Sequence, residues 1–309
     1  MTRGNGIGTG HTVVTATHNV FDNSLAPALS VAPGTVLTFD CPGAPMPPNA
    51  TVADLERIDF SHPHTIVGPV AIEDARPGDA LVVDILDVEL PNDYGHCLFV
   101  PGVGLLPEEF DAPHVQNFHF EDGYTTLGAG VRIPLEPFCG IMGVALAANG
   151  SHSTIPPRSV GGNLDVRDLV AGAQLILPVE VDGALFSCGD GHAAQGDGEV
   201  CVTAIETAVR PTIRLSLLEQ VDLGAPRFTA PARRRPTGDR LGVAATGEDL
   251  FATAQDAVRI MIGDLVETRG LTREEAYVLC SVAADLHISQ IVNFPRWTVS
   301  ATLALDVFV

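Results

Sequence analysis

The stretch Phe186–Glu206 concentrates the residue types that can do chemistry. Within it, Asp190, His192, Asp197 and Glu199 lie among several glycines. Glycine allows backbone and side chains to approach one centre closely. Asp190 and His192 are two residues apart, as are Asp197 and Glu199, so on an extended backbone each pair projects to one side. The two pairs could therefore converge on a single site.

No basic side chain lies near these acids in the sequence, because the nearest are Arg167 and Arg210. If the site is buried, a divalent cation or a shared proton must offset the carboxylate charge. The alternative is a solvated acidic turn, which is common in Gly-rich segments. The apolar runs Ala184–Phe186 and Val200–Ile205 predict strands on both sides, and this favours a loop held between buried strands.

Composition narrows the classes of partner and of chemistry. The 309 residues suffice for one large or two ordinary domains, and the net charge of −21 argues against nucleic acid and anionic membranes. A neutral or cationic ligand suits this charge better. The chain contains no lysine, which excludes a Schiff base, a P-loop lysine, a Ser-Lys dyad and the Glu-Lys-Cys arrangement of nitrilase-like amidases.

The cysteines and the amino terminus bear on the compartment. No C-x-x-C spacing occurs, so the six cysteines are expected to be mostly reduced and buried, which favours the cytoplasm. They are Cys41, Cys97, Cys139, Cys188, Cys201 and Cys280. The first residues lack the apolar core of a signal peptide, and no run approaches the ~18 apolar residues of a membrane span. A soluble, unexported protein is the expectation.

A recurring turn-then-strand phrase predicts an α+β chain that is mainly β, with a β-sandwich or barrel body. The copies are Pro33–Phe39, Pro77–Val83 and Ala171–Leu177, and such punctuation is typical of sandwiches and barrels. Segments dense in proline and glycine predict long loops able to wall a pocket. These segments are residues 41–49, 101–107 and 155–163.

The last part of the chain has helical periodicity. Glu248–Thr268 predicts a helix that ends at Gly270, and Thr272 with Glu275 forms a capping box for a second helix. Strands are expected at Ile288–Val292 and Trp297–Leu303.

These patterns divide the chain into a β-rich body at residues 1–230, which carries the site, and a C-terminal α+β segment at residues 231–309 packed on it. Arg233–Gly238 is the best linker candidate. Its basic run is interpreted as a solvated loop rather than a nucleic-acid patch.

Two candidate groups lie outside the central stretch. His62 and His64 form an H-x-H pair, as in cupin metal sites, but the next glutamate, Glu73, is too distant for that pattern. A single ligand, His64, is the remaining expectation. Asp165 follows a tight turn. It would act either as a helix N-cap or, if it folds back against the central stretch, as a metal ligand. Cys188 could be a nucleophile only if His192 activated it across a glycine turn.

The phrase Gly183–Glu199 resembles the signature of the acetamidase/formamidase family. The resemblance extends along nearly the whole chain, through Gly161–Asp165, Gly68-Pro69 with His64 five residues before the proline, Pro77–Asp79, Gly104–Pro107 and Ala276–Gln290. Cys188 stands where an aliphatic residue is expected, so its thiol is not expected to belong to the family chemistry.

This resemblance implies metal-assisted hydrolysis of short, neutral aliphatic amides, such as formamide or acetamide, to carboxylate and ammonia. A divalent ion, zinc or alternatively calcium, would be held by Asp165 and His192 with Asp190 or His64. Zinc lowers the pKa of bound water toward ~7. The competing interpretations are a metal-stabilised β protein that binds a small molecule without turnover, and a structural calcium site.

Roles in catalysis follow from the same hypothesis. Glu199 is the expected general base, and His192 would be either a ligand or the proton donor. Gln195 is expected to orient the amide. A small pocket floored by glycine and alanine would exclude larger acyl groups. A homo-oligomer is expected, as is usual for soluble enzymes.

Overall fold

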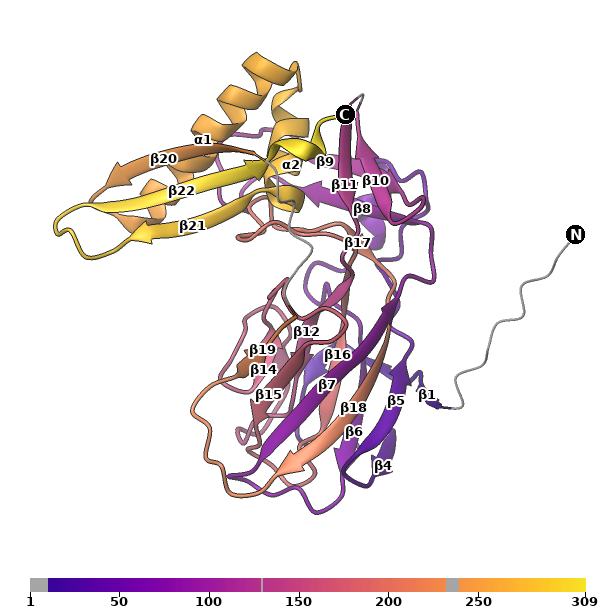
Figure 1. Ribbon diagram of the computed structural model, residues 1–309. Coiled ribbons are helices and arrows are strands. Elements are labelled where there is room, and N and C mark those ends of the chain that lie inside the picture. The colour runs from indigo at the N-terminus through magenta and orange to yellow at the C-terminus, as the bar shows by residue number, and fades with distance from the viewer. Residues whose placement is uncertain (1–10, 129, 232–238) are drawn as a thin grey trace, which may run out of the picture.

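The structure, a computed structural model, describes residues 11–128, 130–231 and 239–309. Figure 1 shows a body of facing β-sheets below and a second unit above it, which contains the helices and a projecting arm of three strands. This is the mainly β, α+β chain that the sequence predicts. The candidate linker Arg233–Gly238 lies outside the described residues.

The first sheet of the body has six strands in the order β1-β5-β18-β7-β15-β19. Only β1 and β5 pair in parallel. The three predicted turn-then-strand phrases form β5, β7 and β15. The bounds are β1 Thr12–Val14, β5 Thr35–Phe39, β18 Arg210–Leu218, β7 Ala80–Glu89, β15 Gln174–Pro178 and β19 Arg227–Thr229.

The second sheet has nine strands, with the path β14-β12-β16-β17-β8-β9 and with β6 joining β16 to β2 and β4. It runs from the body into the upper unit (Figure 1). Its strands are β14 Gly161–Asn163, β12 Phe138–Gly143, β16 Phe186–His192, β17 Glu206–Thr207, β8 Tyr94–Phe99, β9 His114–His119, β6 Ile66–Ile72, β2 Thr17–His18 and β4 Leu29–Val31. Smaller pairs are β3 Val20–Phe21 with β13 His152–Ser153, and β10 Tyr124–Leu127 with β11 Val131–Pro134.

The two sheets of the body form a sandwich around one buried apolar cluster. Phe39, Val83 and Ile213 of the first sheet belong to the same cluster as Val70 and Phe186 of the second. The rings of Phe39 and Phe186 meet edge to face at 5.6 Å. Burial of these side chains drives the two sheets together and fixes the position of β16.

The C-terminal unit begins with β20 Arg240–Gly247 and contains α1 Leu250–Arg269 and α2 Arg273–Ala283. Gly270, with φ 69°, ends α1, and Thr272 with Glu275 forms the capping box of α2, as predicted. The strands β21 Asp285–Gln290 and β22 Trp297–Ala304 follow, and η2 Leu305–Val307 ends the unit. The strand predicted at Ile288–Val292 therefore begins and ends earlier than expected.

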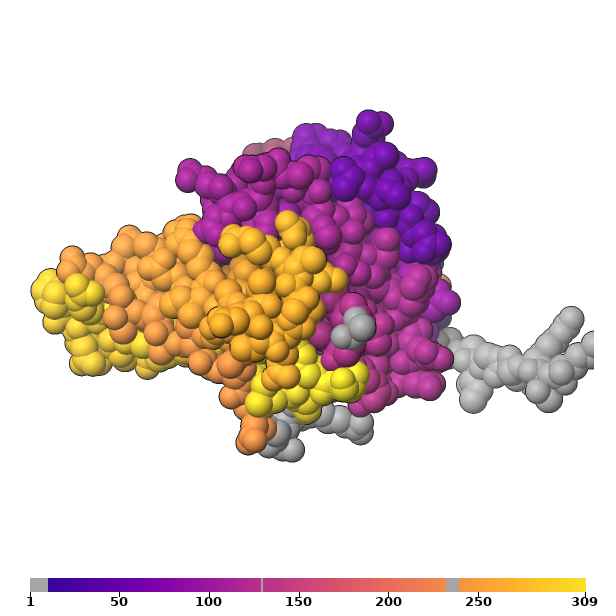
Figure 2. All heavy atoms as spheres, turned by 90° about the horizontal axis from the view of Figure 1, so that it is seen from above, coloured from indigo at the N-terminus to yellow at the C-terminus, as the bar shows by residue number. Residues whose placement is uncertain are grey.

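The C-terminal sheet has the order β20-β22-β21 and projects from one side of the molecule (Figures 1 and 2). No helix in the described chain combines the length and apolar character that crossing a bilayer requires.

A second apolar core joins the C-terminal unit to the upper end of the nine-stranded sheet. It contains Phe99 and Phe118 from β8 and β9, Val200 from the central stretch, and Tyr277 and Leu279 from α2. The central stretch is thus buried against the helices. The domain division at residues 230 and 231 stays a prediction, and this core draws side chains from both sides of it.

We expect Thr272→Ala to destabilise the protein because it removes the side-chain cap of α2. The loss should be about 1 kcal/mol in the free energy of unfolding, measured by denaturant titration. Thr268→Ala is the matched control, because that exposed threonine bonds only a carbonyl within α1. It should change stability little. Equal effects of the two substitutions would contradict the capping role.

Candidate active site

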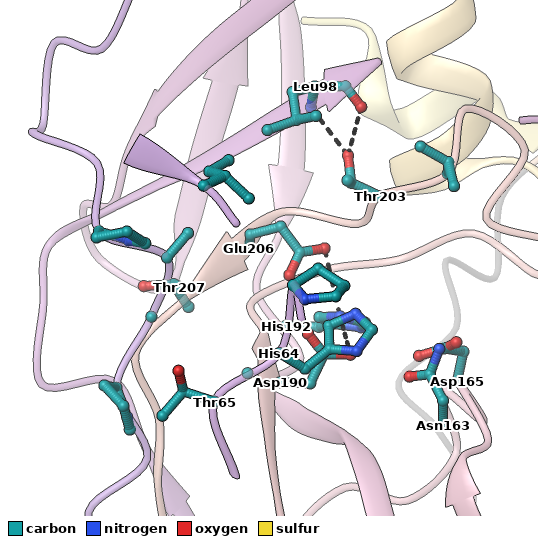
Figure 3. Close-up of a pocket in the computed structure, with 18 of the residues that line it drawn as sticks. His64, Thr65, Leu98, Asn163, Asp165, Asp190, His192, Thr203, Glu206 and Thr207 are labelled. Atoms are coloured by element: carbon teal, nitrogen blue, oxygen red, sulfur yellow. Dashed lines mark hydrogen bonds and ion pairs between the residues drawn. The ribbon is translucent and has the colours of Figure 1, made fainter. Parts of the chain in front are cut away.

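A pocket of about 140 Å³ opens beside the end of β16, where the central stretch leaves the sandwich. The loops at residues 42–45, 58–65 and 199–203 form part of its wall. Titratable side chains gather in it, and Figure 3 shows most of them together. They are His64, Asp165, Asp190, His192, Glu199 and Glu206. The structure therefore brings together every predicted metal ligand and Glu199.

His192 lies at the centre of this group and is 1% exposed. Its Nε2 atom is 3.3 Å from Glu206 Oε1, 3.5 Å from Asp190 Oδ2 and 3.9 Å from Glu199 Oε1. Phe138 packs edge to face against the ring. Three carboxylates thus face one nitrogen of a single buried imidazole.

Strand geometry explains two of these contacts. Asp190 and His192 are the expected same-side pair, and both lie near the end of β16. Glu206 was not identified from the sequence. It lies directly opposite His192 in the antiparallel pairing of β16 with β17, where side chains are about 5 Å apart at Cβ. Glu206 directly follows the apolar run Val200–Ile205. Its role becomes visible only from the pairing register of the two strands.

Gln195 fixes the orientation of His192 from behind. Its Nε2 donates to the backbone oxygen of Asp165 at 2.9 Å, so its Oε1 accepts from His192 Nδ1, also at 2.9 Å. The proton on Nδ1 leaves Nε2 as the nitrogen that faces the carboxylates. Both ends of the Gln195 amide are occupied, and the residue does not line the pocket. The amide-orienting role expected for Gln195 does not match this position.

Asp165 does fold back against the central stretch. No helix begins there, so the N-cap alternative is wrong; the residue has φ 48° and its side chain lines the pocket. Its Oδ1 atom is buried without a hydrogen-bond partner. Burial raises the pKa of Asp165 to about 7, against the opposing effect of His192.

Gly140 of β12 is the position on which these groups converge. A methyl group there would lie 2.6 Å from Asp165 Oδ1, 2.8 Å from Asp190 Oδ2 and 2.8 Å from His192 Cε1. Any side chain at this position would fill the space between the candidate ligands. Gly140 could not be identified from the sequence, because this approach depends on the pairing of β12 with the distant β16.

The charges of the cluster are strongly coupled. Burial and the charge of Asp165 raise the pKa of Glu199 well above its usual range. Burial opposes ionisation of Asp190, but the charge and hydrogen bond of His192 lower its pKa. Burial would lower the pKa of His192, but Glu206 and Asp190 raise it well above its usual value. The site thus holds more negative charge than its imidazole offsets.

The H-x-H pair divides between two environments. His64 lines the pocket, and its Nδ1 lies 3.0 Å from Thr154 Oγ1. Figure 3 shows its ring near His192 and Asp190. His62 instead lies at the surface, 3.5 Å from Asp59. Only His64 is therefore placed to contribute to the site.

Asp197 does not join the pocket. Its carboxylate lies 3.9 Å from the Arg167 guanidinium, which also pairs with Asp285. The expected convergence of Asp197 with Asp190 is therefore wrong, and an arginine distant in sequence does approach the central stretch. Val200–Ile205 is also not a strand, although most of this run is buried.

Cys188 lies on the sandwich side of β16, away from the pocket. Its Sγ is 3.9 Å from Cys41 Sγ, and Cys139 belongs to the same thiol cluster. All six cysteines are free and buried, as predicted. The structure does not place the Cys188 thiol on the pocket wall.

The loop that carries Glu199 is fixed by the C-terminal unit. Ser281 of α2 accepts from the backbone nitrogen of Cys201 and donates to the Thr203 carbonyl. The Tyr277 hydroxyl donates to the Val200 carbonyl. Together with backbone bonds from Leu105 to Val200 and between Ile205 and residues 193 and 194, these side-chain bonds explain how an apolar run can be buried without being a strand.

The donor set fits a divalent cation. Two groups share His192, namely Asp165 with Glu199 and Asp190 with Glu206, and the ligand atoms of each group lie within 4.8 Å of one another. Carboxylate and imidazole donors suit zinc, and a set dominated by oxygen also suits calcium. The unpartnered Asp165 Oδ1 and the space above Gly140 agree with an ion at this position.

Comparison with known proteins agrees with this architecture. A model of the Acetamidase/Formamidase family matches residues 10–149 and 145–309. The formamidase of Methylophilus methylotrophus is 26% identical, over 94% of this chain and 89% of its own. The gamma lactamase from Delftia acidovorans has a TM-score of 0.88 at 25% identity, covering 94% of this chain and 89% of that one. The acetamidase from Bacillus halodurans has a TM-score of 0.67 at 31% identity, covering 95% and 97%.

Fold and family together define the chain as an amidase, a hydrolase of amide carbon–nitrogen bonds. It belongs to the Acetamidase/Formamidase family, as the Gly183–Glu199 phrase predicted.

Gly140→Ala is expected to abolish activity while the fold persists, because the added methyl group would occupy the space shared by Asp165 and Asp190. We expect amide hydrolysis to fall about 100-fold or more, with circular dichroism unchanged. Gly263→Ala, in α1, is the matched control, since a methyl group there meets nothing within 4 Å. Full activity in the Gly140 variant would show that the space shared by Asp165, Asp190 and His192 is not needed for the reaction.

Proposed function

We propose that the protein hydrolyses short carboxamides with the assistance of a divalent metal ion, zinc in the first instance. The reaction is RCONH2 + H2O giving RCOO⁻ and NH4⁺. Family membership supports the amide bond as the target. The observation that carries the proposal is the group of four carboxyl side chains around the buried His192, in a pocket with no arginine among its described lining residues.

His192 Nε2 would bind the ion together with Asp165 and Asp190, and His64 lines the same pocket. The ion would polarise the amide carbonyl and acidify water. Because Gln195 accepts the Nδ1 proton of His192, that nitrogen is occupied by its hydrogen bond. His192 then offers a single nitrogen to the pocket, which favours the ligand role over that of proton donor.

We assign proton transfer to Glu199. It lines the pocket beside His192, and its raised pKa brings the carboxyl group toward the range in which it can accept and release a proton. It would take a proton from the attacking water and deliver it to the departing amine. The surrounding carboxylates would stabilise the ammonium product by charge.

Gln195 is best described as a positioning residue. Its amide connects the His192 ring to the Asp165 backbone, which are two parts of the site distant in sequence. It would act on the reaction only through the orientation of His192.

A cyclic amide is the second candidate substrate. The TM-score of 0.88 to the Delftia acidovorans gamma lactamase, against 0.67 to the Bacillus halodurans acetamidase, favours it. Parallel assays of ring opening and of ammonia release would separate the two. Elemental analysis of the same sample would also separate an enzyme from a metal-stabilised binder, which would contain metal but show no turnover.

Glu199→Gln should retain the fold and the bound metal but lower turnover about 100-fold or more, because the amide side chain cannot accept the proton. Ammonia release and metal content would be measured on one preparation. Asp197→Asn is the matched control, since Asp197 lies in the same stretch but outside the pocket. Unchanged turnover in the Glu199 variant would exclude it as the base.

Removal of metal by a chelator should abolish amide hydrolysis, and addition of zinc should restore it. The physical reason is that the clustered carboxylates alone do not polarise a carbonyl. Ammonia release would be measured before chelation, after chelation and after zinc is returned. Full activity in protein shown by elemental analysis to be free of metal would end the metal proposal.

A further inference from the structure

One part of the pocket lining is apolar, in contrast to its acidic group. Ile58, Phe60, Leu98 and Val202 form this part. Phe60 is 52% exposed and Val202 is 45% exposed, whereas Leu98 is buried. When an apolar ligand covers large apolar side chains that are exposed in a pocket, removal of their surface from water favours binding.

Val202 is held there in a strained conformation. Its φ is +86°, a left-handed value that is a genuine outlier for a β-branched residue. Its backbone nitrogen donates to the Glu199 carbonyl at 3.0 Å. The next residue is anchored to β8, where Thr203 Oγ1 donates to the Leu98 carbonyl at 2.8 Å. Such strain persists only where the surroundings over-determine it, and it is concentrated at functional sites.

The apolar wall is preformed. Leu98 belongs to a small buried cluster with Met46, Ala50 and Leu55, and Ile58 packs against that cluster. Leu55 lies in the 3-10 helix η1 Val52–Arg57. The loop that carries Phe60 is thus supported from within, and the wall does not depend on a substrate for its shape.

The carboxyl groups of the pocket limit which substrates it can admit. Asp165, Asp190, Glu199 and Glu206 line the pocket, and no arginine is among its described lining residues. The chain also contains no lysine that could approach from elsewhere. Because carboxyl groups dominate the polar lining, the pocket is less favourable to an anionic substrate than to a neutral one.

We propose that Val202 and Phe60 form an acyl subsite, and that the substrate is an uncharged amide whose acyl chain is longer than acetyl. This inference rests on the proposed amide hydrolysis. The volume of about 140 Å³ corresponds to roughly five water molecules, which leaves room for an acyl chain longer than acetyl. The sequence predicts a small pocket floored by glycine and alanine; Gly43, Ala44 and Gly191 do line it, together with these larger apolar side chains.

The test measures kcat/KM for acetamide, propionamide, butanamide and pentanamide with the zinc-loaded full chain. A buried methylene contributes about fourfold, so the subsite predicts a rise of about tenfold or more from acetamide to pentanamide. In Val202→Gly and Val202→Asn, the ratio of pentanamide to acetamide should fall at least about fourfold. Both replacements tolerate a left-handed backbone, so both should fold.

Gln220→Gly is the matched control. Gln220 also has a positive φ, 51°, but it lies outside the pocket. It should leave the substrate ratio unchanged.

A second comparison isolates charge from shape. Succinamate and 4-methylpentanamide have nearly the same shape. Succinamate ends in a carboxylate, whereas 4-methylpentanamide ends in an isopropyl group. The carboxyl groups of the pocket should repel the carboxylate of succinamate. We therefore expect kcat/KM to be at least about 100-fold lower for succinamate than for 4-methylpentanamide.

The outcomes separate this inference from the proposed function. A flat chain-length profile, or a ratio that the Val202 variants leave unchanged, would overturn the subsite while amide hydrolysis stands. Equal rates for succinamate and 4-methylpentanamide would overturn the exclusion of anions. Absence of hydrolysis of every amide would instead contradict the proposed function itself.

Discussion

The structure depends on one electrostatic constraint, the burial of His192 among carboxylates. Glu206, Asp190 and Glu199 all approach its Nε2 atom, and Asp165 converges on the same space beside Gly140. Charges removed from water are stable only when they are paired or bind a cation. Because His192 offsets only part of this charge, the arrangement requires a proton or a metal ion at its centre. The proposed chemistry follows from that requirement.

Rigid elements on three sides keep these groups together. The sandwich fixes β16 and therefore Asp190 and His192, while β17 places Glu206 opposite. Gln195 locks the imidazole. The helices of the C-terminal unit hold the remaining side, because Ser281 and Tyr277 bond the loop that follows Glu199. This unit, which lies far from the central stretch in sequence, therefore supports the active site directly.

Helices and strands could be predicted because their signals lie within a few neighbouring residues. Contacts between separate elements could not be predicted from such local signals. The caps of α1 and α2 could be identified because Gly270 and the pair Thr272 with Glu275 act within a few residues. The same-side geometry of Asp190 and His192 followed from strand periodicity. Glu206 and Gly140 could not be found, since the role of Glu206 depends on the register between β16 and β17, and that of Gly140 on the pairing of β12 with the distant β16.

Errors in the prediction have the same origin. Val200–Ile205 is apolar because it is buried against α2, and side chains of that helix satisfy its backbone in place of a ladder. Asp197 was grouped with the site because of its spacing, but Arg167 draws it away through a contact that spacing does not reveal. Sequence patterns indicate which segments are buried, but they do not identify the helix, strand or side chain that a segment contacts.

Anomalous diffraction at the zinc edge, from crystals of the full chain in zinc, tests the central claim most directly. The account predicts a peak at bonding distance, about 2.0–2.2 Å, from His192 Nε2 and from carboxylate oxygens of Asp165 or Asp190. Amide hydrolysis by the dissolved crystals would connect that ion to function. Active protein with no peak at His192, or with zinc only at the thiols of Cys41, Cys139 and Cys188, would contradict the account.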